Sequence, residues 1–312
     1  MDRLEAMKVF VIAVDEGSFA GAARTLKRSS SAVSRAISFL EAHVGAPLFH
    51  RTTRSMRLSP AGERYAVSCR RILAELEEAE LFVADERAAP QGALTISAPP
   101  IGGEEVLRPI VDAFLKAHPA VTARLQLVDR SVNLVDEGVD LALRVGDLPD
   151  SSLVAVKVGG EVRRVIAAAP AYLAERPPIV TPSDLEAHDI VAMANFGVDR
   201  WMFPPAPGST ATRVVGFTPR ILVNSVRAAV ASAVEGLGVT RLYSYHLAAE
   251  VQAGRLRIVL ADAEPPPQPA HLLVQPTRMP VPKVRAFMDF AVPRLRTQFG
   301  RLAAEARSLY PG

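Results

Sequence analysis

Short hydroxyl side chains and one arginine gather on one side of a helix that the sequence predicts over residues 29–41. Ser29 is a suitable N-cap for this helix. Its buried row is predicted to be Val33, Ile37 and Leu40, which recur at helical spacing. The outer side then carries Ser30, Ser31, Ser34, Arg35 and Ser38. Small hydroxyls and a guanidinium suit the base edges and phosphates of DNA, so we expect this helix to lie in a major groove.

The positive charge of the chain is concentrated around this helix. Residues 24–57 hold seven arginines and lysines against the single acid Glu41, a net charge of +6, whereas the whole chain carries only +3. A local excess of this kind is typical of a DNA footprint. The alternative is an ordinary helical hairpin with solvated charges. We disfavour that alternative because a solvated face usually pairs Glu with Lys, whereas this one is rich in serine.

Two predicted helices precede the serine-rich one. An apolar stripe over residues 4–14 predicts the first, and Gly17 ends it. Ser18 can cap the second helix, which runs to about Leu26. The candidate DNA contacts on these helices are Ser18, Ser29, Ser30, Ser31, Ser34, Arg35 and Ser38.

A basic loop follows over residues 50–63. Alternation at Met56 and Leu58 predicts a brief strand pair. The tip of this pair carries Arg51, Thr52, Thr53, Arg54 and Ser55. We expect the tip to touch phosphates as a wing, which positions a protein on DNA without conveying sequence.

One long helix is predicted from Ala61 to about Arg87. A regular apolar seam runs along it, at Tyr65, Cys69, Ile72, Leu76, Ala79 and Val83. The 4-3-4-3-4 spacing favours a dimerising coiled coil, and the alternative is a helix packed on its own domain. Cys69 is interpreted as a small buried apolar residue rather than a redox switch. Residues 88–92 form a linker.

The composition excludes several classes of protein and site. With 49% hydrophobic and 22% charged residues, the chain is globular rather than disordered. Cys69 is the only cysteine and the six histidines are scattered, so no disulfide framework, zinc site or other cofactor is expected. The N-terminus lacks the features of a signal peptide, and no apolar run reaches the roughly 18 residues that span a bilayer. We expect a protein of the reducing cytoplasm with no membrane partner.

Beyond the linker, strands alternate with helices. Strands are predicted at 93–98, 121–128, 139–145, 162–168, 189–193, 220–223, 238–241, 256–260 and 270–275. Helices are predicted at 104–117, 182–187, 226–236 and 280–298. This alternation predicts an α/β fold with mainly parallel sheets. A stretch of this length divides naturally into two lobes with a pocket where they meet.

Ligand contacts in such a fold are expected where strands end and helices begin. The candidates are Pro100, Ile101, Gly102, Arg144, Asn224, Ser225 and Thr240. A plain loop or capping role stays open for each of them, and Arg144 could equally pair with Asp147. Glu104 and Glu105 make the helix end beside them less attractive to an anion. The sequence therefore predicts no charge for the ligand.

The sequence disfavours three other functions. An enzyme is disfavoured because the chain has no GxSxG, no P-loop, no GxGxxG after a strand and no metal cluster. A transport-associated solute-binding protein would lack the N-terminal helical module. An architectural DNA binder without a ligand would not need so long a lobed domain.

The residues from 17 to 62 match a known family signature. The matched positions are Gly17-Ser18-Phe19, Ala20 to Ala23, Arg24, Leu26, Ala32-Val33-Ser34-Arg35, Ile37, Leu40-Glu41, Gly45, Pro47-Leu48-Phe49, Arg51 and Leu58-Ser59-Pro60-Ala61-Gly62. On these residues the chain resembles the LysR-type transcriptional regulators, and the resemblance covers essentially its whole length. So many matched positions in one module make the signature specific.

The resemblance implies a winged helix-turn-helix over 1–60, a linker and dimerisation helix over 61–91, and an effector-binding domain over 92–300. That domain resembles the two-lobed type-2 periplasmic-binding proteins, with lobe 1 at about 92–161 and 266–300 and lobe 2 at about 162–265. Family members bind double-stranded DNA as dimers or tetramers and respond to a small-molecule effector. The resemblance thus implies a sequence-specific transcriptional regulator that acts on the nucleoid in the cytoplasm, with RNA polymerase as a candidate partner.

Two positions depart from the family pattern. Ser30-Ser31 stand where Gln-Pro usually follows the capping serine, and Arg28 replaces the apolar residue that commonly precedes that cap. The missing glutamine removes a bidentate adenine reader. The DNA bases that this chain recognises therefore cannot be inferred from those of other family members.

Overall fold

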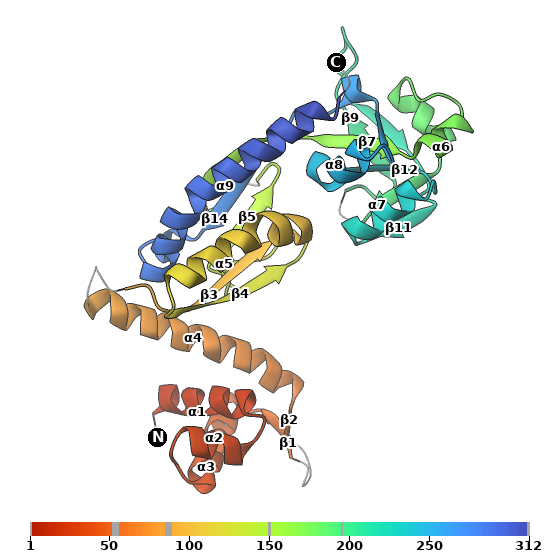
Figure 1. Ribbon diagram of the computed structural model, residues 1–312. Helices are drawn as coiled ribbons and strands as arrows, with labels where there is room; N and C mark the ends of the chain where they lie inside the picture. The colour runs from red at the N-terminus through yellow and green to blue at the C-terminus, as the bar shows by residue number, and fades with distance from the viewer. Residues whose placement is uncertain (1, 52–55, 85–88, 149–150, 195, 311–312) are drawn as a thin grey trace. The chain divides into compact units, whose positions relative to one another are not determined.

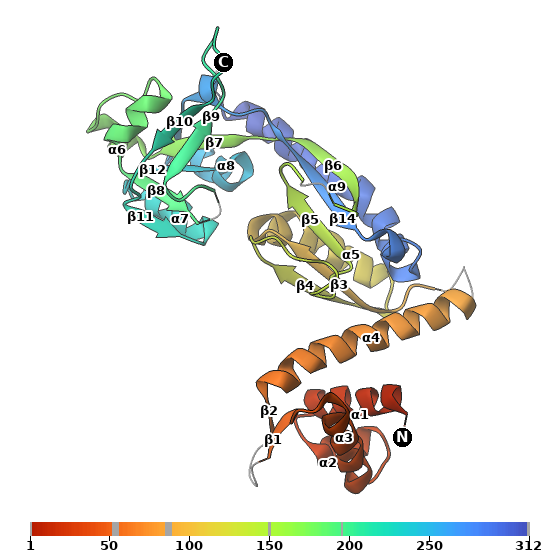
Figure 2. The ribbon, with the colours of Figure 1, turned by 180° about the vertical axis from the view of Figure 1, so that it is seen from behind.

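A computed structural model describes residues 2–51, 56–84, 89–148, 151–194 and 196–310. The chain divides into two units, residues 1–88 and 89–312. Figures 1 and 2 show their elements from opposite sides. Within the described ranges, no helix is long and apolar enough to cross a membrane.

The first unit contains three short helices, a hairpin and one long helix. In chain order these are α1 (Arg3–Asp15), α2 (Phe19–Thr25), α3 (Ser30–Val44), β1 (Phe49–Arg51), β2 (Met56–Leu58) and α4 (Pro60–Ala84). The side chains of Asp2, Ser18 and Ser29 each accept a backbone N–H from the first turn of α1, α2 and α3. Gly45 ends α3 at φ +72°, in the left-handed region that favours glycine. The predicted caps at Ser18 and Ser29 are confirmed.

Aromatic rings join the helices of the first unit to its hairpin. The ring of Phe10 on α1 is fully buried, and its centroid lies 5.5 Å from that of Phe49 and 5.8 Å from that of Tyr65. Phe19 of α2 meets Phe49 edge-on, with the centroids 5.4 Å apart. Edge-to-face pairs of this kind add to the free energy gained by burial. One core therefore holds α1, α2, β1 and the start of α4 together.

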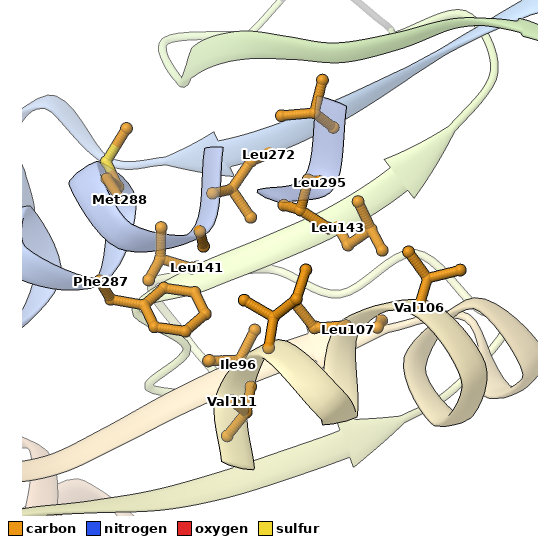
Figure 3. Close-up of a cluster of buried hydrophobic side chains, with 14 of the residues drawn as sticks. Ile96, Val106, Leu107, Val111, Leu141, Leu143, Leu272, Phe287, Met288 and Leu295 are labelled. Carbon is orange, nitrogen blue, oxygen red and sulfur yellow. The ribbon is translucent and has the colours of Figure 1, made fainter. Parts of the chain in front are cut away.

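The second unit has two five-stranded sheets, and the first of them defines lobe 1. Its strands lie in the order β4 (Val121–Leu127), β3 (Gly92–Ala98), β5 (Leu141–Val145), β14 (Gln268–Val274) and β6 (Val154–Val162). Helices α5 (Arg108–Ala117) and α9 (Pro282–Ser308) pack on this sheet. Figure 3 shows the core that they enclose, with Ile96 and Leu141 from the strands, Val111 from α5 and Phe287 from α9.

The second sheet defines lobe 2. Its strands lie in the order β11 (Ile221–Val223), β8 (Ile190–Met193), β12 (Val239–Tyr243), β7 (Arg164–Ala168) and β13 (Arg257–Val259). The other elements of this part of the chain are α6 (Pro170–Ala174), η2 (Pro182–Ala187), β9 (Arg200–Phe203), β10 (Arg213–Gly216), α7 (Val226–Val234), α8 (Ser244–Gln252) and η3 (Ala261–Ala263). Strands β9 and β10 form a separate antiparallel pair. Lobe 2 is therefore an α/β layer of its own.

Both large sheets are mixed, and the prediction of mainly parallel sheets is wrong. In lobe 1, β3 is parallel to β4 and β5, but β14 is antiparallel to β5 and β6. In lobe 2, β8 is parallel to β11 and β12, but β7 is antiparallel to β12 and β13. The antiparallel strands are those at which the chain passes from one lobe to the other. Local alternation of strands and helices does not reveal such crossings.

Several element boundaries also differ from the sequence-based expectations. Strands β6, β9 and β10 were not predicted, and the last helix continues to Ser308 instead of ending at residue 298. The helix expected over 104–117 consists of a π-helical segment, η1 (Gly102–Leu107), followed by α5. Pro109 at the start of α5 has no backbone N–H. It therefore cannot donate the i→i−4 hydrogen bond that a regular α-helix would have there. A short helix, η4 (Pro276–Arg278), precedes α9.

Candidate DNA-contacting helix and effector cavity

Helix α3 presents one buried and one exposed side. Val33, Ile37 and Leu40 are at most 1% exposed, so the predicted register of this helix is confirmed. Ser34 is half-buried, and the exposed residues of the predicted outer row are Ser30, Ser31, Arg35 and Ser38. The row is set by the apolar residues opposite it, because their burial fixes the rotation of the helix.

Ser18 and Ser29 cap helices with their hydroxyls. The Ser18 hydroxyl accepts the N–H of Gly21 at 3.0 Å, and the Ser29 hydroxyl accepts the N–H of Ala32 at 3.2 Å. Ser29 Oγ also lies 3.0 Å from Ser31 Oγ. These hydroxyls hold the starts of α2 and α3, and contact with DNA would come in addition to that role.

Arg28, in the turn before α3, is tied to the first helix. Its guanidinium forms an ion pair with the carboxylate of Glu5 on α1. Glu5 lies outside residues 24–57, the segment with a net charge of +6. The ion pair therefore offsets part of that charge. It also gives Arg28 a partner within the fold at a position where the family commonly has an apolar residue.

The hairpin after α3 has the predicted strand pair. Its register joins Phe49 with Leu58, and Arg51 with Met56. Arg51 therefore lies at the end of β1, whereas its side chain is outside the described part of the chain. Thr52, Thr53 and Arg54, the other predicted wing contacts, also lie outside the described residues.

The first half of the α4 seam packs on its own unit. Cys69 is 0% exposed, and Tyr65 and Ile72 pack against the same core as α1 and α3. Cys69 thus has no surface left for a second chain, which corrects its assignment to a dimer interface. Burial raises the pKa of its thiol to about 11. Leu76 is partly exposed, and the side chains of Ala79 and Val83 lie outside the described part.

The second unit contains a cavity of about 1010 Å³ lined by both lobes. Its lining residues are Pro99, Val128, Asp129, Arg130, Ser131, Val132, Asn133, Leu134, Val135, Ala142, Arg144, Val145, Gly146, Asp147, Leu148, Ser151, Ser152, Leu153, Arg164, Phe196, Tyr243, Tyr245, His246, Gln268 and Leu273. We call it the inter-lobe cavity. A hollow of this size, with apolar walls and a few polar groups, fits a small molecule.

Only Arg144 of the predicted effector contacts is among the described lining residues of this cavity. Ile101 is 6% exposed and packs in an apolar cluster with residues of lobe 2. Thr240 is fully buried and donates its hydroxyl to the carbonyl of Val191 at 3.1 Å, so it is a core residue and its assignment is corrected.

The remaining predicted contacts are not among the described lining residues of the cavity. Ser225 caps α7, accepting the N–H of Ala228 at 3.4 Å, and Asn224 is the exposed residue before it. Pro100 and Gly102 stand where η1 begins. A side chain at Gly102 would lie 3.5 Å from the Tyr245 hydroxyl, so this glycine borders a lining residue.

Arg144 is held by neutral groups of lobe 1 and interacts with a nearby acid. Its Nη2 donates to Ser97 Oγ and its Nη1 to the Leu143 carbonyl, both at 2.8 Å. Burial lowers the pKa of Arg144, against the opposing effect of Asp129. Burial also raises the pKa of Asp129, which Arg144 counteracts. The charges that act against this lowering of the Arg144 pKa are those of Asp129 and then Glu137, and they do not include Asp147, the alternative partner left open by the sequence.

Arg164 and three neighbours also line the cavity, and the sequence analysis missed them. Arg164 Nη2 donates to Tyr243 Oη at 3.3 Å and to Gln268 Oε1 at 3.5 Å. Its guanidinium lies 5.0 Å from the ring centroid of Phe196 and 5.3 Å from that of Tyr243. The available signal was an arginine at the edge of an apolar strand, since a buried cation needs a reason to be there.

The rings of Tyr243, Tyr245 and His246 also line the cavity. The rings of Tyr243 and Tyr245 are nearly parallel, with centroids 6.0 Å apart, and His246 lies 4.2 Å from Tyr245. Burial lowers the pKa of His246 to about 3 and raises that of Tyr245. Both groups are therefore neutral near pH 7.

Comparison with known proteins identifies the family. Residues 4–63 match the bacterial regulatory helix-turn-helix protein, lysR family, and residues 87–296 match the LysR substrate binding domain. The chain belongs to the LysR family of transcriptional regulators. An HTH-type transcriptional regulator of Xanthomonas campestris pv. campestris is 34% identical, over 92% of this chain and 84% of that regulator. The regulator PtxR of Pseudomonas aeruginosa is 32% identical, over 96% of this chain and 93% of its own length.

Solved structures of LysR-family regulators share the architecture. The full-length virulence activator AphB of Vibrio cholerae has a TM-score of 0.62 and 27% identity, over 94% of this chain and 99% of its own. CrgA of Neisseria meningitidis has a TM-score of 0.57 and 28% identity, over 93% of this chain and 98% of its own. This LysR-family protein is accordingly a DNA-binding transcriptional regulator with an effector-binding domain.

Proposed function

We propose that the outer row of α3 is the surface with which this regulator reads DNA. The exposure of Ser30, Ser31 and Arg35 opposite a fully buried row supports this assignment. Hydroxyls and a guanidinium hydrogen-bond to base edges and phosphates. Ser34, Ser38 and the capping serines belong to the same proposal, and Arg51, Thr52, Thr53 and Arg54 would position the wing on phosphates.

The inter-lobe cavity is our candidate for the effector site. Its wall contains Arg144 of β5 in lobe 1 and Arg164 of β7 in lobe 2, so a bound ligand would contact both sheets. A ligand that binds one spacing of the lobes more tightly shifts the population toward that spacing. In an oligomer, such a shift would alter how two copies of α3 are presented to a roughly symmetric DNA site.

Self-association is assigned to α4. Cys69 is buried within its own unit, so the proposed surface for a second copy consists of the partly exposed Tyr65, Ile72 and Leu76 and would continue through Ala79 and Val83. Two or four copies would assemble through this surface, as the dimers and tetramers of the LysR-type resemblance imply. RNA polymerase is proposed as a further partner, and the bacterial cytoplasm, at the nucleoid, as the place of action.

The decisive experiment is a DNA-binding series on full-length protein. A genomic map of bound sites first supplies the operator. Arg35→Ala should then weaken operator binding by about 1–3 kcal/mol if Arg35 reads a base, or reduce the salt slope by about 1 if it contacts a phosphate. Arg301→Ala, which removes an exposed arginine from α9, is the matched control and should leave both unchanged. Unchanged affinity and unchanged salt slope in Arg35→Ala would reject the assignment of α3.

A further inference from the structure

The arginines of the inter-lobe cavity differ in whether an acid accompanies them. Arg130 donates both Nη atoms to the carboxylate of Glu137, at 2.7 and 2.6 Å. Arg144 interacts with the half-buried Asp129. The charge of each of these two arginines is therefore opposed by an acid of the same lobe.

Arg164 has no such acid among the described residues. Its Nη2 reaches only the neutral oxygens of Tyr243 and Gln268, at the long distances of 3.3 and 3.5 Å. Its Nε is buried without a hydrogen-bond partner in the described part of the chain. A cation with a buried donor left unpaired is costly unless an anion joins it.

A buried arginine, Arg241, adds positive charge close enough to Arg164 for the two to repel each other. Arg241, two residues before Tyr243, is 5% exposed and donates Nη1 to the Met202 carbonyl at 3.0 Å. Burial and the like charge of Arg164 lower the pKa of Arg241 to about 10. Glu264, the acid that opposes this effect, is already bound by Arg163 at 2.8 Å and by Tyr310 at 2.5 Å. A negative charge beside Arg164 would relieve this repulsion.

Flat apolar surfaces stand next to the same guanidinium. Phe196 and Tyr243 flank Arg164, with Tyr245 stacked beyond Tyr243. His246, which is neutral, adds a further ring to the wall. Aromatic rings bind other flat apolar groups by offset or edge-on contact.

We propose that the inter-lobe cavity binds a small aromatic monocarboxylate, with its carboxylate on Arg164 and its ring against Phe196, Tyr243 and Tyr245. The proposal rests on the cavity being the effector site. A single negative charge follows because, among the described residues of the cavity wall, Arg164 is the arginine that no acid accompanies. A dianion would meet the carboxylates of Asp129 and Asp147, which also line the cavity.

The position of Arg164 links this ligand to the junction of the lobes. Tyr243 Oη on β12 of lobe 2 lies 2.8 Å from Gln268 Oε1 on β14 and 3.4 Å from the Val145 carbonyl on β5, both in lobe 1. Arg164 donates hydrogen bonds to Tyr243 Oη and to Gln268 Oε1. A carboxylate on Arg164 would compete for the same donors and so would change hydrogen bonds that join the lobes.

Calorimetry of the full-length protein with three probes tests the chemistry. Benzoate supplies both charge and ring, benzamide the ring alone, and acetate the charge alone. We expect benzoate to bind and to raise the Tm, with benzamide and acetate at least about tenfold weaker. Arg164→Gln should weaken benzoate at least about tenfold, and Arg164→Lys, which keeps the charge, should retain part of the affinity. Arg200→Gln, an exposed arginine outside the cavity, is the control and should bind benzoate like the wild type.

The outcomes separate the ligand class from the function of the site. Benzamide binding as tightly as benzoate, benzoate binding unaffected in folded Arg164→Gln, or no benzoate binding up to about 10 mM would each overturn the ligand class. Operator affinity measured with and without benzoate is a separate readout. If benzoate binds through Arg164 and operator affinity does not change, the ligand class stands and the effector role of the cavity fails.

Discussion

Glu104 and Arg227 join the two lobes by an ion pair, with Oε2 of the glutamate 2.5 Å from Nη2 of the arginine. Glu104 lies in η1 of lobe 1 and Arg227 in the first turn of α7 in lobe 2. Glu105 adds a second carboxylate oxygen at 3.6 Å. The acids that the sequence placed at a helix end are therefore contacts between the lobes.

Arg227→Ala should loosen this junction with little loss of overall stability. The side chains of Arg227 and Glu104 are 64% and 41% exposed, so water screens the pair and we expect the free energy of unfolding to fall by less than about 1 kcal/mol. Amide hydrogen exchange in η1 and at the start of α7 should nevertheless become faster, since local opening is no longer opposed. Arg200→Ala removes an exposed ion pair within lobe 2 and should leave exchange at these segments unchanged. Unchanged protection in Arg227→Ala would show that the pair does not restrain the lobes.

Ser29→Ala should destabilise the first unit, whereas Ser30→Ala should not. Loss of the Ser29 cap leaves the Ala32 N–H without its acceptor and should cost about 1 kcal/mol. Ser30 is exposed in the first turn, and its replacement should change stability by less than about 0.5 kcal/mol. Urea unfolding of the full-length variants, followed by helical circular dichroism, gives both values. Equal stability of the two variants would contradict the capping role.

Cys69 should make the first unit less stable at alkaline pH. Because burial raises its pKa to about 11 in the folded state, the unfolded chain loses this proton first. The protonated thiol therefore contributes stability fully below the unfolded pKa of about 9, and that stability is lost as pH rises through about 11.

The measurement is the difference in unfolding free energy between the wild type and Cys69→Ala. The unfolding free energy of the wild type, relative to that of Cys69→Ala, should fall by on the order of 2 kcal/mol as pH rises from about 8.5 to about 11. Cys69→Ala serves as the control because it retains every other titrating group. A difference that stays constant with pH would show that the thiolate forms equally easily in both states.

Leu76→Asp should weaken the proposed self-association. A carboxylate in an apolar interface is poorly solvated, so we expect the dissociation constant of the oligomer to rise at least about tenfold in sedimentation equilibrium. Val67, on the same helix but off the seam, is 53% exposed, and Val67→Asp is the matched control. If Leu76→Asp associates as tightly as the wild type, α4 is not the interface beyond Cys69.

Helical periodicity and capping chemistry are local, so they could be predicted from the sequence. The apolar residues that fix the rotation of α3 lie within eight positions of one another, and Ser29 caps the turn that follows it. The seam of α4 shows where local reasoning fails. Its spacing indicates one apolar face but not which surface covers it, and Cys69 proves to be buried in the core of its own unit.

The sequence by itself determined the family, the DNA-contacting module and its register, because these depend on neighbours a few residues apart. Only the tertiary structure brought together Arg164, Phe196, Tyr243 and Gln268, which are spread over more than one hundred residues of the chain. Their meeting depends on strand order, in which β7 and β12 pair in lobe 2 while β14 returns to lobe 1. A strand's own residues specify its faces but not its distant partners, so the cavity and the surroundings of Arg164 emerge only when the sheets assemble.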